Sequence, residues 1–455
     1  MPLKTVDVFK TKGRPEHTYV SVTSGKYERQ LSASIESRGT LCLITGPSKT
    51  GKTTLVSKVC EQIGLEMIVV RCDNQLESVD FWRAALEAVK FERLTTRTNG
   101  RKVGTNTSGK LTLGWEWLGK LTGEFLTALS TERSEQDSRE RVLAKASPAH
   151  LIPVLQEANA LLVIEDFHYL NPGVQKTIFQ QWKAFVDAEV SVVVIGTTHH
   201  ACDLADANKD LVGRISTIQL SSWLENDLRM IVRNGANALN VTVEFDTERR
   251  IAAESVGLPI VTQGVAQALF LKHNIEEAAS VPKELTVSRK ELHHVFNELA
   301  NSSYRQFREM YDRIISGLRR KARYKTYECL LLAFADDPIA FRLRRGEIID
   351  RIQRLSIPDS ARPPEGSIKH SLSHLKKLQE KLGCELLEWV PRDDILYIVE
   401  PTFLFYLRWR NAREDGSDRK VLFESLFDNL EVIISSRGRH SLETVRVLSK
   451  GTEKG

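Results

Sequence analysis

Hydrophobic residues in the first half of the chain form short apolar runs, and amphipathic stretches separate these runs. Apolar runs bounded by turn residues predict strands that are buried on both faces, here over residues 41–45, 66–70, 161–164 and 190–196. Stretches with helical periodicity lie between them, over residues 51–63, 81–89, 148–156 and 174–188. This alternation predicts an α/β fold, a parallel sheet covered by helices on both faces.

The pattern becomes helical almost throughout after residue 216. Predicted helices cover residues 225–239, 247–255 and 260–273, and two more lie between 288 and 323. Three further helices, over 324–335, 345–355 and 367–382, precede a hairpin of residues 386–390 and 395–399. Three helices followed by a two-stranded wing is the order of a winged helix. We therefore predict an α/β domain over residues 1–220, a helical subdomain over 221–320, a winged-helix domain over 321–435 and a flexible tail over 436–455.

Residues 92–146 interrupt the α/β pattern. Their first part, 92–112, is rich in Thr, Gly, Asn and Lys and offers almost nothing to bury, which predicts an exposed insertion. A solvated loop is the simpler interpretation, and contact with an anionic partner is the alternative. Trp115, Trp117 and Phe125 indicate some packing in the second part.

Composition narrows the class of protein. The chain has 455 residues, 41% of them hydrophobic and 27% charged, as is ordinary for a soluble globular protein. No apolar run approaches the ~18 residues of a membrane span, and the N-terminus lacks a secretory signal, so we expect a cytoplasmic protein. The six cysteines are scattered without a C-x-x-C pair, which favours reduced, buried thiols. The net charge is +5 with its excess in residues 301–455, which permits nucleic-acid contact there without requiring it.

The loop between the first predicted strand and its helix has the spacing G-x-x-x-x-G-K-T. Glycines allow the backbone to wrap a phosphate with its N–H groups inward, and the helix adds its positive N-terminal end. In this pattern Lys52 reaches the β- and γ-phosphates, and the Thr53 hydroxyl binds Mg²⁺. We therefore predict ATP and Mg²⁺ as cofactors, with a nucleotide-binding set of Gly46, Pro47, Gly51, Lys52, Thr53 and Thr54.

Two carboxylates follow the buried strand 161–164, at the strand end where ligands bind in open parallel sheets. Glu165 and Asp166 are candidates for holding Mg²⁺ through water and for polarising the attacking water. Thr197 and Thr198 end the next strand, and a hydroxyl there is placed for the γ-phosphate or the attacking water. The adjacent pair His199–His200 is not expected to bind a metal, because neighbouring side chains point apart.

These motifs resemble those of the AAA+ and STAND group of P-loop ATPases. The resemblance identifies Lys52 and Thr53 with Walker A, Glu165 and Asp166 with Walker B, and Thr197 or Thr198 with sensor 1. It places Arg214 at the arginine-finger position, although an ordinary surface salt bridge is the alternative for this residue. The sequence Gly257-Leu258-Pro259 resembles the GxP motif, whose proline lies by the adenine, and Tyr19 and Glu28 resemble an upstream segment that lines the base.

One departure from the family pattern bears on activity. The usual order of the Walker B acids is Asp-Glu or Asp-Asp, whereas this chain has Glu165 before Asp166. The shorter second acid implies slow hydrolysis or a site that a neighbouring subunit completes.

The resemblance implies a switch in which ATP bridges the sheet domain and a helical lid and so controls self-association. One hypothesis is an ATPase that regulates a protein effector, as in bacterial anti-phage defence modules. The alternative is an AAA+ regulator of transposition or replication initiation that binds duplex DNA through its winged helix. Helical spacing places Lys369, Lys376 and Lys377 on the outward face of that helix, while Leu372, Leu375 and Leu378 turn toward the core. The same layout is typical of an ordinary solvated helix.

Overall fold

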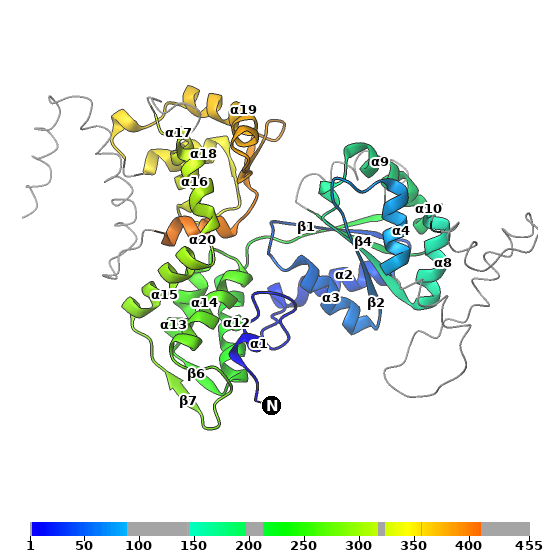
Figure 1. Ribbon diagram of the computed structural model, residues 1–455, viewed down its shortest axis with the longest axis horizontal. Helices are drawn as coiled ribbons and strands as arrows, with labels where there is room; N and C mark the ends of the chain where they lie inside the picture. The colour runs from blue at the N-terminus through cyan, green and yellow to red at the C-terminus, as the bar shows by residue number, and fades with distance from the viewer. Residues whose placement is uncertain are drawn as a thin grey trace, which may run out of the picture. The chain divides into compact units, whose positions relative to one another are not determined.

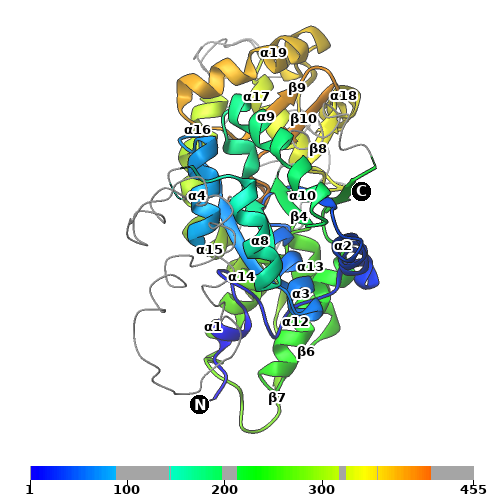
Figure 2. The same cartoon turned by 90° about the vertical axis from the view of Figure 1, so that its right-hand side faces the viewer.

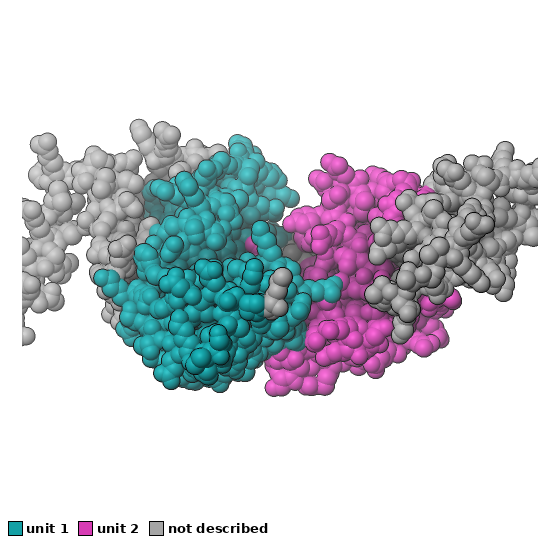
Figure 3. All heavy atoms as spheres, turned by 60° about the horizontal axis from the view of Figure 1, so that its bottom comes forward, with its two compact units in different colours: residues 1–20, 222–455 teal, residues 21–221 magenta. Residues whose placement is uncertain are grey.

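The computed structural model describes residues 2–88, 143, 145–196, 213–316, 324–355 and 357–410. The chain forms two compact units, coloured separately in Figure 3. Residues 21–221 form one, called here the sheet unit, and residues 1–20 with 222–455 form the other, called the helical unit. Almost all of the predicted insertion 92–146 and all of the predicted tail lie outside the described residues.

A five-stranded sheet is the framework of the sheet unit. Its order is β2-β3-β4-β1-β5, and every neighbouring pair is parallel. The strands are β1 (Leu41–Thr45), β2 (Glu66–Arg71), β3 (Ala160–Glu165), β4 (Val192–Gly196) and β5 (Ile215–Gln219). The predicted α/β class and parallel sheet are therefore confirmed. The apolar pattern did not predict β5, because this edge strand buries only Ile218 completely.

Helices cover both faces of this sheet (Figure 1). One face carries α4 (Ser78–Ala88), α8 (Pro148–Ala158), α9 (Pro172–Gln181) and α10 (Lys183–Asp187), and the other carries α2 (Lys26–Glu36) and α3 (Lys52–Ile63). Successive side chains of a strand point to opposite faces, so Leu41 and Leu43 join the first core while Cys42 and Ile44 join the second. This double burial explains the continuous apolar runs of the sequence.

The helical unit contains mostly helices and two small sheets. Its helices are α1 (Thr5–Val8), α12 (Glu225–Ala238), α13 (Phe245–Glu254), α14 (Pro259–Lys272), α15 (Arg289–Ser302), α16 (Gln306–Ser316), α17 (Thr326–Ala335), α18 (Arg345–Arg354), α19 (Glu365–Leu382) and α20 (Thr402–Trp409). Strands β6 (Val241–Val243) and β7 (Lys283–Leu285) form a parallel pair. The predicted hairpin is present as β9 (Leu387–Val390) and β10 (Ile395–Ile398), and β8 (Arg342–Arg344) adds a third antiparallel strand beside β10. Figure 2 shows this sheet with α17, α18 and α19 near it.

One hydrophobic core runs through the helical unit, from Val8 to Trp409. Every residue of α20 is buried, and the helix is apolar around most of its circumference, so it packs on both sides. Its Trp409 ring contacts Phe296 of α15, and its Phe403 ring contacts Phe307 of α16. The predicted boundary near residue 320 therefore does not divide the core.

The N-terminal residues belong to the helical unit, although the sequence analysis grouped them with the α/β domain. Thr5 donates a backbone hydrogen bond to the carbonyl of Glu276 and a side-chain bond to the carbonyl of Ile275. The Phe9 ring is fully buried and lies 5.1 Å from that of Phe270. These partners are more than 250 residues away in the sequence, so local patterns did not reveal them.

The cysteines of the described residues are Cys42, Cys60, Cys72, Cys329 and Cys384, all buried and unpaired in disulfides. Burial raises the pKa of the Cys42 and Cys329 thiols to about 12, so both are protonated and unreactive at neutral pH. Cys202 lies outside the described residues. Within the described part of the chain, the helices are too short or too polar to cross a bilayer.

Candidate nucleotide-binding site

The phosphate loop lies at the carboxyl edge of the sheet, between the end of β1 at Thr45 and the start of α3 at Lys52. Gly46 has a φ of 145° and Gly51 a φ of 91°, values that side-chain-bearing residues rarely adopt. A Cβ on Gly46 would also lie 2.5 Å from the backbone oxygen of Leu220. The glycines of the motif are therefore required by the shape of the loop.

Hydrogen bonds hold the loop closed on itself. The hydroxyl of Thr50 donates to the carbonyl of Pro47 at 2.9 Å. Lys52 Nζ donates to the carbonyls of Gly46 at 2.9 Å and Pro47 at 2.7 Å, so its ammonium group lies over the loop. A phosphate at this point would meet the lysine charge and the N-terminal N–H groups of α3, whose first turn also carries Thr54.

Thr53 and Glu165 connect the phosphate loop to the end of β3. The Thr53 hydroxyl donates a 2.6 Å hydrogen bond to Glu165 Oε1, and Glu165 is only 7% exposed. A hydroxyl and a carboxylate oxygen are the hard ligands that Mg²⁺ takes beside a bound phosphate. The donor set therefore fits Mg²⁺, which Thr53 and Glu165 would hold.

Arg71 is a site residue that the sequence reasoning missed. The pairing of β2 with β3 places Arg71 directly opposite Glu165, and its Nε lies 3.1 Å from Glu165 Oε2. The signal was present in the sequence, because Arg71 follows a predicted parallel strand and must end at the same edge as Glu165.

Asp166 occupies a different environment from Glu165. Its backbone is left-handed, with φ 59°, where β3 turns into a short 3₁₀ segment, Phe167–Tyr169. Partial burial and the charge of Glu165 raise the pKa of the Asp166 carboxyl, while Lys52 and Arg71 oppose the rise. The two acids thus differ: Glu165 accepts a hydrogen bond from Thr53, and Asp166 lies at the turn that follows β3.

Packing behind the turn fixes the position of Asp166. Gln175 of α9 donates through Nε2 to the carbonyl of Leu170 at 2.8 Å and to that of Phe167 at 3.3 Å. The Phe167 ring lies against Trp182, which is buried in the core. The buried Gln175 amide and the Phe167–Trp182 pair therefore stabilise the turn that carries Asp166.

Arg214 lies at the amino-terminal ends of the parallel strands, whereas the phosphate loop lies at their carboxyl-terminal ends. It is exposed, it directly precedes β5, and its carbonyl accepts from Leu41 N, at the start of β1. The register pairs Leu41 with Ile215 and Thr45 with Gln219, so the length of β1, roughly 13 Å, separates Arg214 from the loop. Arg214 therefore does not reach a phosphate on the loop of its own chain. Thr197, Thr198, His199 and His200 lie outside the described residues.

Tyr19 and Pro259, the predicted adenine neighbours, both belong to the helical unit. Thr18, beside Tyr19, accepts a 2.6 Å hydrogen bond from Gln263, which is one turn along α14 from Pro259. Glu28 is buried on α2 of the sheet unit. The structure thus joins the residue before Tyr19 to α14, the helix that begins at Pro259, and separately brings the phosphate loop near Glu165 and Asp166.

A five-stranded parallel sheet with a phosphate loop after β1 and acids after β3 defines a P-loop NTPase fold. Residues 35–203 match the family model described as an AAA domain, and this match supports an ATPase activity in general.

Solved structures with similar folds have low identity to this chain. The Walker-type ATPase PABY2304 of Pyrococcus abyssi is 14% identical, with a TM-score of 0.49, over 88% of this chain and 99% of that one. Cdc6p of Pyrobaculum aerophilum is 12% identical, with a TM-score of 0.40, over 93% and 99%. The Aeropyrum pernix ORC1 protein, solved in complex with DNA, is 13% identical, with a TM-score of 0.40, over 88% and 94%. A search of curated proteins found no match.

Proposed function

We propose that this protein is an ATP-hydrolysing molecular switch of the STAND/AAA+ type, whose nucleotide state controls its assembly with a partner effector protein. The observation that carries the ATPase part is the 2.6 Å bond between Thr53 and Glu165, next to Lys52 on the phosphate loop. It joins the two motifs that bind phosphate and metal, which are 112 residues apart in the sequence.

The chemistry follows from the positions of these side chains. Mg²⁺ supplies charge neutralisation between the β- and γ-phosphates when it is bound. Thr53 and Glu165 would hold it, and Lys52 would bind the phosphate oxygens. Asp166, whose pKa is raised by partial burial and by the charge of Glu165, would accept a proton from the attacking water.

The two acids should separate binding from turnover. We expect Glu165→Gln to reduce Mg²⁺-dependent ATP affinity, because a neutral amide binds the metal poorly. Asp166→Asn should leave this affinity nearly unchanged and lower turnover by about 10²–10⁴-fold, the usual contribution of a general base. Calorimetry with ATP and Mg²⁺, combined with a phosphate-release assay, measures both quantities.

Asp73→Asn is the matched control for these variants. Asp73 follows β2 at the same edge, and its side chain accepts from Gln75 N, a bond that an asparagine keeps. This control should retain wild-type binding and turnover. Full turnover in Asp166→Asn together with lost turnover in Glu165→Gln would reverse the assigned roles.

Self-association is part of the proposal because Arg214 lies away from its own phosphate loop. An arginine finger at this place acts on the nucleotide of a second copy. The expected cytoplasmic location comes from the sequence composition, and the place in an anti-phage defence module comes from the family resemblance. The contacts of Tyr19 and Pro259 with adenine likewise stay a prediction.

DNA binding through a winged helix is the second candidate, and α19 is the observation that favours it. Lys369, Lys376 and Lys377 are exposed along this helix, while Leu372, Leu375 and Leu378 are buried. His370 and His374 are exposed on the same helix, and Glu380 reduces the positive charge of this surface. The three-stranded sheet beside α19 supports the winged-helix interpretation of residues 326–398.

Salt dependence tests this second candidate. If the three lysines contact phosphates, changing them together to alanine should flatten the slope of log affinity for duplex DNA against log salt by about 0.9 per lost contact. The control changes Lys272, Lys283 and Lys290, three exposed lysines elsewhere in the helical unit, and removes the same charge. Equal slopes for wild type and the α19 variant, or no binding at low salt, would leave α19 as a protein-docking or solvated surface.

A further inference from the structure

The peptide that leaves the sheet unit touches the phosphate loop. Leu220 N donates to the carbonyl of Thr45, the last residue of β1. The Leu220 carbonyl lies so close to Gly46 that no side chain fits there. Leu220 therefore packs directly against the backbone of the phosphate loop.

Two residues further along, the same peptide contacts the turn between α13 and α14. Trp223 N donates a 3.0 Å hydrogen bond to the carbonyl of Gly257. A Cβ on Gly257, which has a φ of 73°, would lie 2.7 Å from Ser222 Cβ. The turn is also fixed to α13, because Ser255 donates to the carbonyl of Ile251 and its own carbonyl accepts from Leu258 N.

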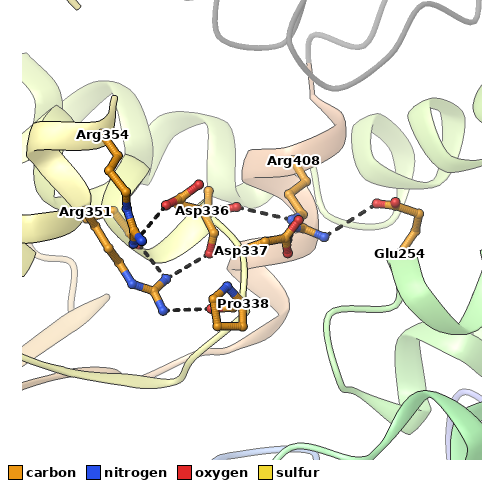
Figure 4. Close-up of polar contacts among 9 residues, drawn as sticks. Glu254, Asp336, Asp337, Pro338, Arg351, Arg354 and Arg408 are labelled. Carbon is orange, nitrogen blue, oxygen red and sulfur yellow. Dashed lines mark hydrogen bonds and ion pairs between the residues drawn. The ribbon is translucent and has the colours of Figure 1, made fainter. Parts of the chain in front are cut away.

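The last turn of α13 carries Glu254, and Glu254 pairs with a buried arginine of α20 (Figure 4). Arg408 is 6% exposed at its side chain, and its guanidinium lies 3.6 Å from Glu254. The same guanidinium bonds Asp337 and donates from Nε to the carbonyl of Ala335 at 3.3 Å. Arg408 thus binds one carboxylate on each side, from α13 and from the loop after α17.

A second buried arginine holds this loop from its other side. Arg351 of α18 donates to the carbonyls of Asp336 and Pro338, both at 2.8 Å, and to that of Ala333 at 3.1 Å. Arg354 of the same helix pairs with the Asp336 carboxylate. Because α18 begins directly after β8, the loop is tied to the three-stranded sheet.

We infer that Arg408 is a coupling residue, which relays the state of the phosphate loop from α13 to the loop Asp336–Pro338 and its sheet. The relay runs from Gly46 through the peptide 220–223, the Gly257 turn and Glu254 to Arg408 and Asp337. Arginine suits this role because its planar guanidinium engages several acceptors in fixed directions. The inference rests on the proposed function, since a nucleotide must occupy the phosphate loop for its state to be relayed.

Hydrogen exchange on the full chain tests the relay, with and without the non-hydrolysed analogue AMP-PNP and Mg²⁺. In wild type, we expect nucleotide to change exchange both in the turn 255–258 and at Asp336–Asp337. In Glu254→Gln, which keeps the side-chain shape but removes the charge, the change at the turn should remain and that at Asp336–Asp337 should be lost. Asp246→Asn is the control, because Asp246 forms its ion pairs within the described residues with Arg249 and Arg250 of the same helix.

Calorimetry on the same samples separates the two possible failures. Absence of AMP-PNP binding would overturn the proposed function and the relay with it. Normal binding without a change at Asp336–Asp337 in wild type, or with an unaltered change in Glu254→Gln, would overturn the relay alone.

A melting experiment tests the contact itself and needs no nucleotide. Glu254→Gln should lower the melting temperature in the wild-type background and lower it less in Arg408→Met, where its partner is missing. The cycle is repeated with Arg408→Lys, which retains the buried charge and is the milder change. Equal shifts in the wild-type and Arg408→Met backgrounds would show that the pair is not coupled and would overturn the inference.

Discussion

Lys52→Ala is expected to weaken ATP binding by about 10- to 150-fold and to abolish measurable turnover while the protein remains folded. Charge-assisted hydrogen bonds of the kind that Lys52 offers to phosphate oxygens contribute ~1.5–3 kcal/mol each, which corresponds to this range of affinity. In the structure the lysine already lies over the loop, bonded to the carbonyls of Gly46 and Pro47. Calorimetry with ATP and Mg²⁺ gives the affinity, and circular dichroism monitors the fold.

Two variants make the Lys52 result specific. Lys58→Ala removes a lysine from the same helix, where it pairs with Glu61 at the surface, so it should bind ATP as wild type does. Lys52→Met keeps most of the length of the side chain without the charge, and it should lose as much affinity as Lys52→Ala. Wild-type affinity and turnover in Lys52→Ala would show that residues 46–53 are not the phosphate site.

Arg214→Ala is expected to spare nucleotide binding and to lower the rate of hydrolysis by ~10³-fold or more. Arginine fingers stabilise the charge that develops on the transferred phosphoryl group, and their removal costs this much in other P-loop enzymes. Because Arg214 lies at the amino-terminal ends of the strands and its own phosphate loop lies at their carboxyl-terminal ends, the effect must operate between two copies. Wild-type turnover per chain should therefore rise with protein concentration until assembly is complete.

Mixing experiments distinguish a finger from a surface salt bridge. Subunits with Arg214→Ala keep the phosphate loop, and subunits with Lys52→Ala keep the finger, so a mixture should recover part of the activity that each lacks alone. Arg38→Gln, which removes a charge shortly before β1 at the same edge, should turn over ATP normally. Wild-type turnover by Arg214→Ala alone would eliminate the finger role.

Lys52→Ala and Arg214→Ala together show whether ATP hydrolysis needs one copy of the chain or two. Loss of activity on changing Lys52, without dependence on Arg214 or on concentration, would describe a monomeric site. Dependence on both residues would explain how a site with the unusual acid order Glu165-Asp166 becomes competent, since a second copy would supply the arginine that the chain's own Arg214 cannot bring to its phosphate loop.

The sequence by itself determined the strands β1 to β4 and the phosphate loop. Strands buried on both faces must be apolar at every position, and the loop needs glycines where φ is positive, so both leave a local record. The same holds for Glu165 and Asp166, because the apolar run that precedes them marks the end of a strand. Helix α19 was also readable, since Leu372, Leu375 and Leu378 recur at helical spacing.

Only the tertiary structure decided which of these residues meet, and which residues complete the site. Arg71 lies directly across from Glu165 because β2 pairs with β3. Arg214 lies far from its own phosphate loop because β5 runs parallel to β1 and Arg214 precedes β5. The attachment of residues 1–20 to the helical unit depends on contacts between residues far apart in the sequence, as does the single core around α20. The Glu254–Arg408–Asp337 cluster is of the same kind, because ion pairs between distant segments are set by packing and leave no periodic pattern in the chain.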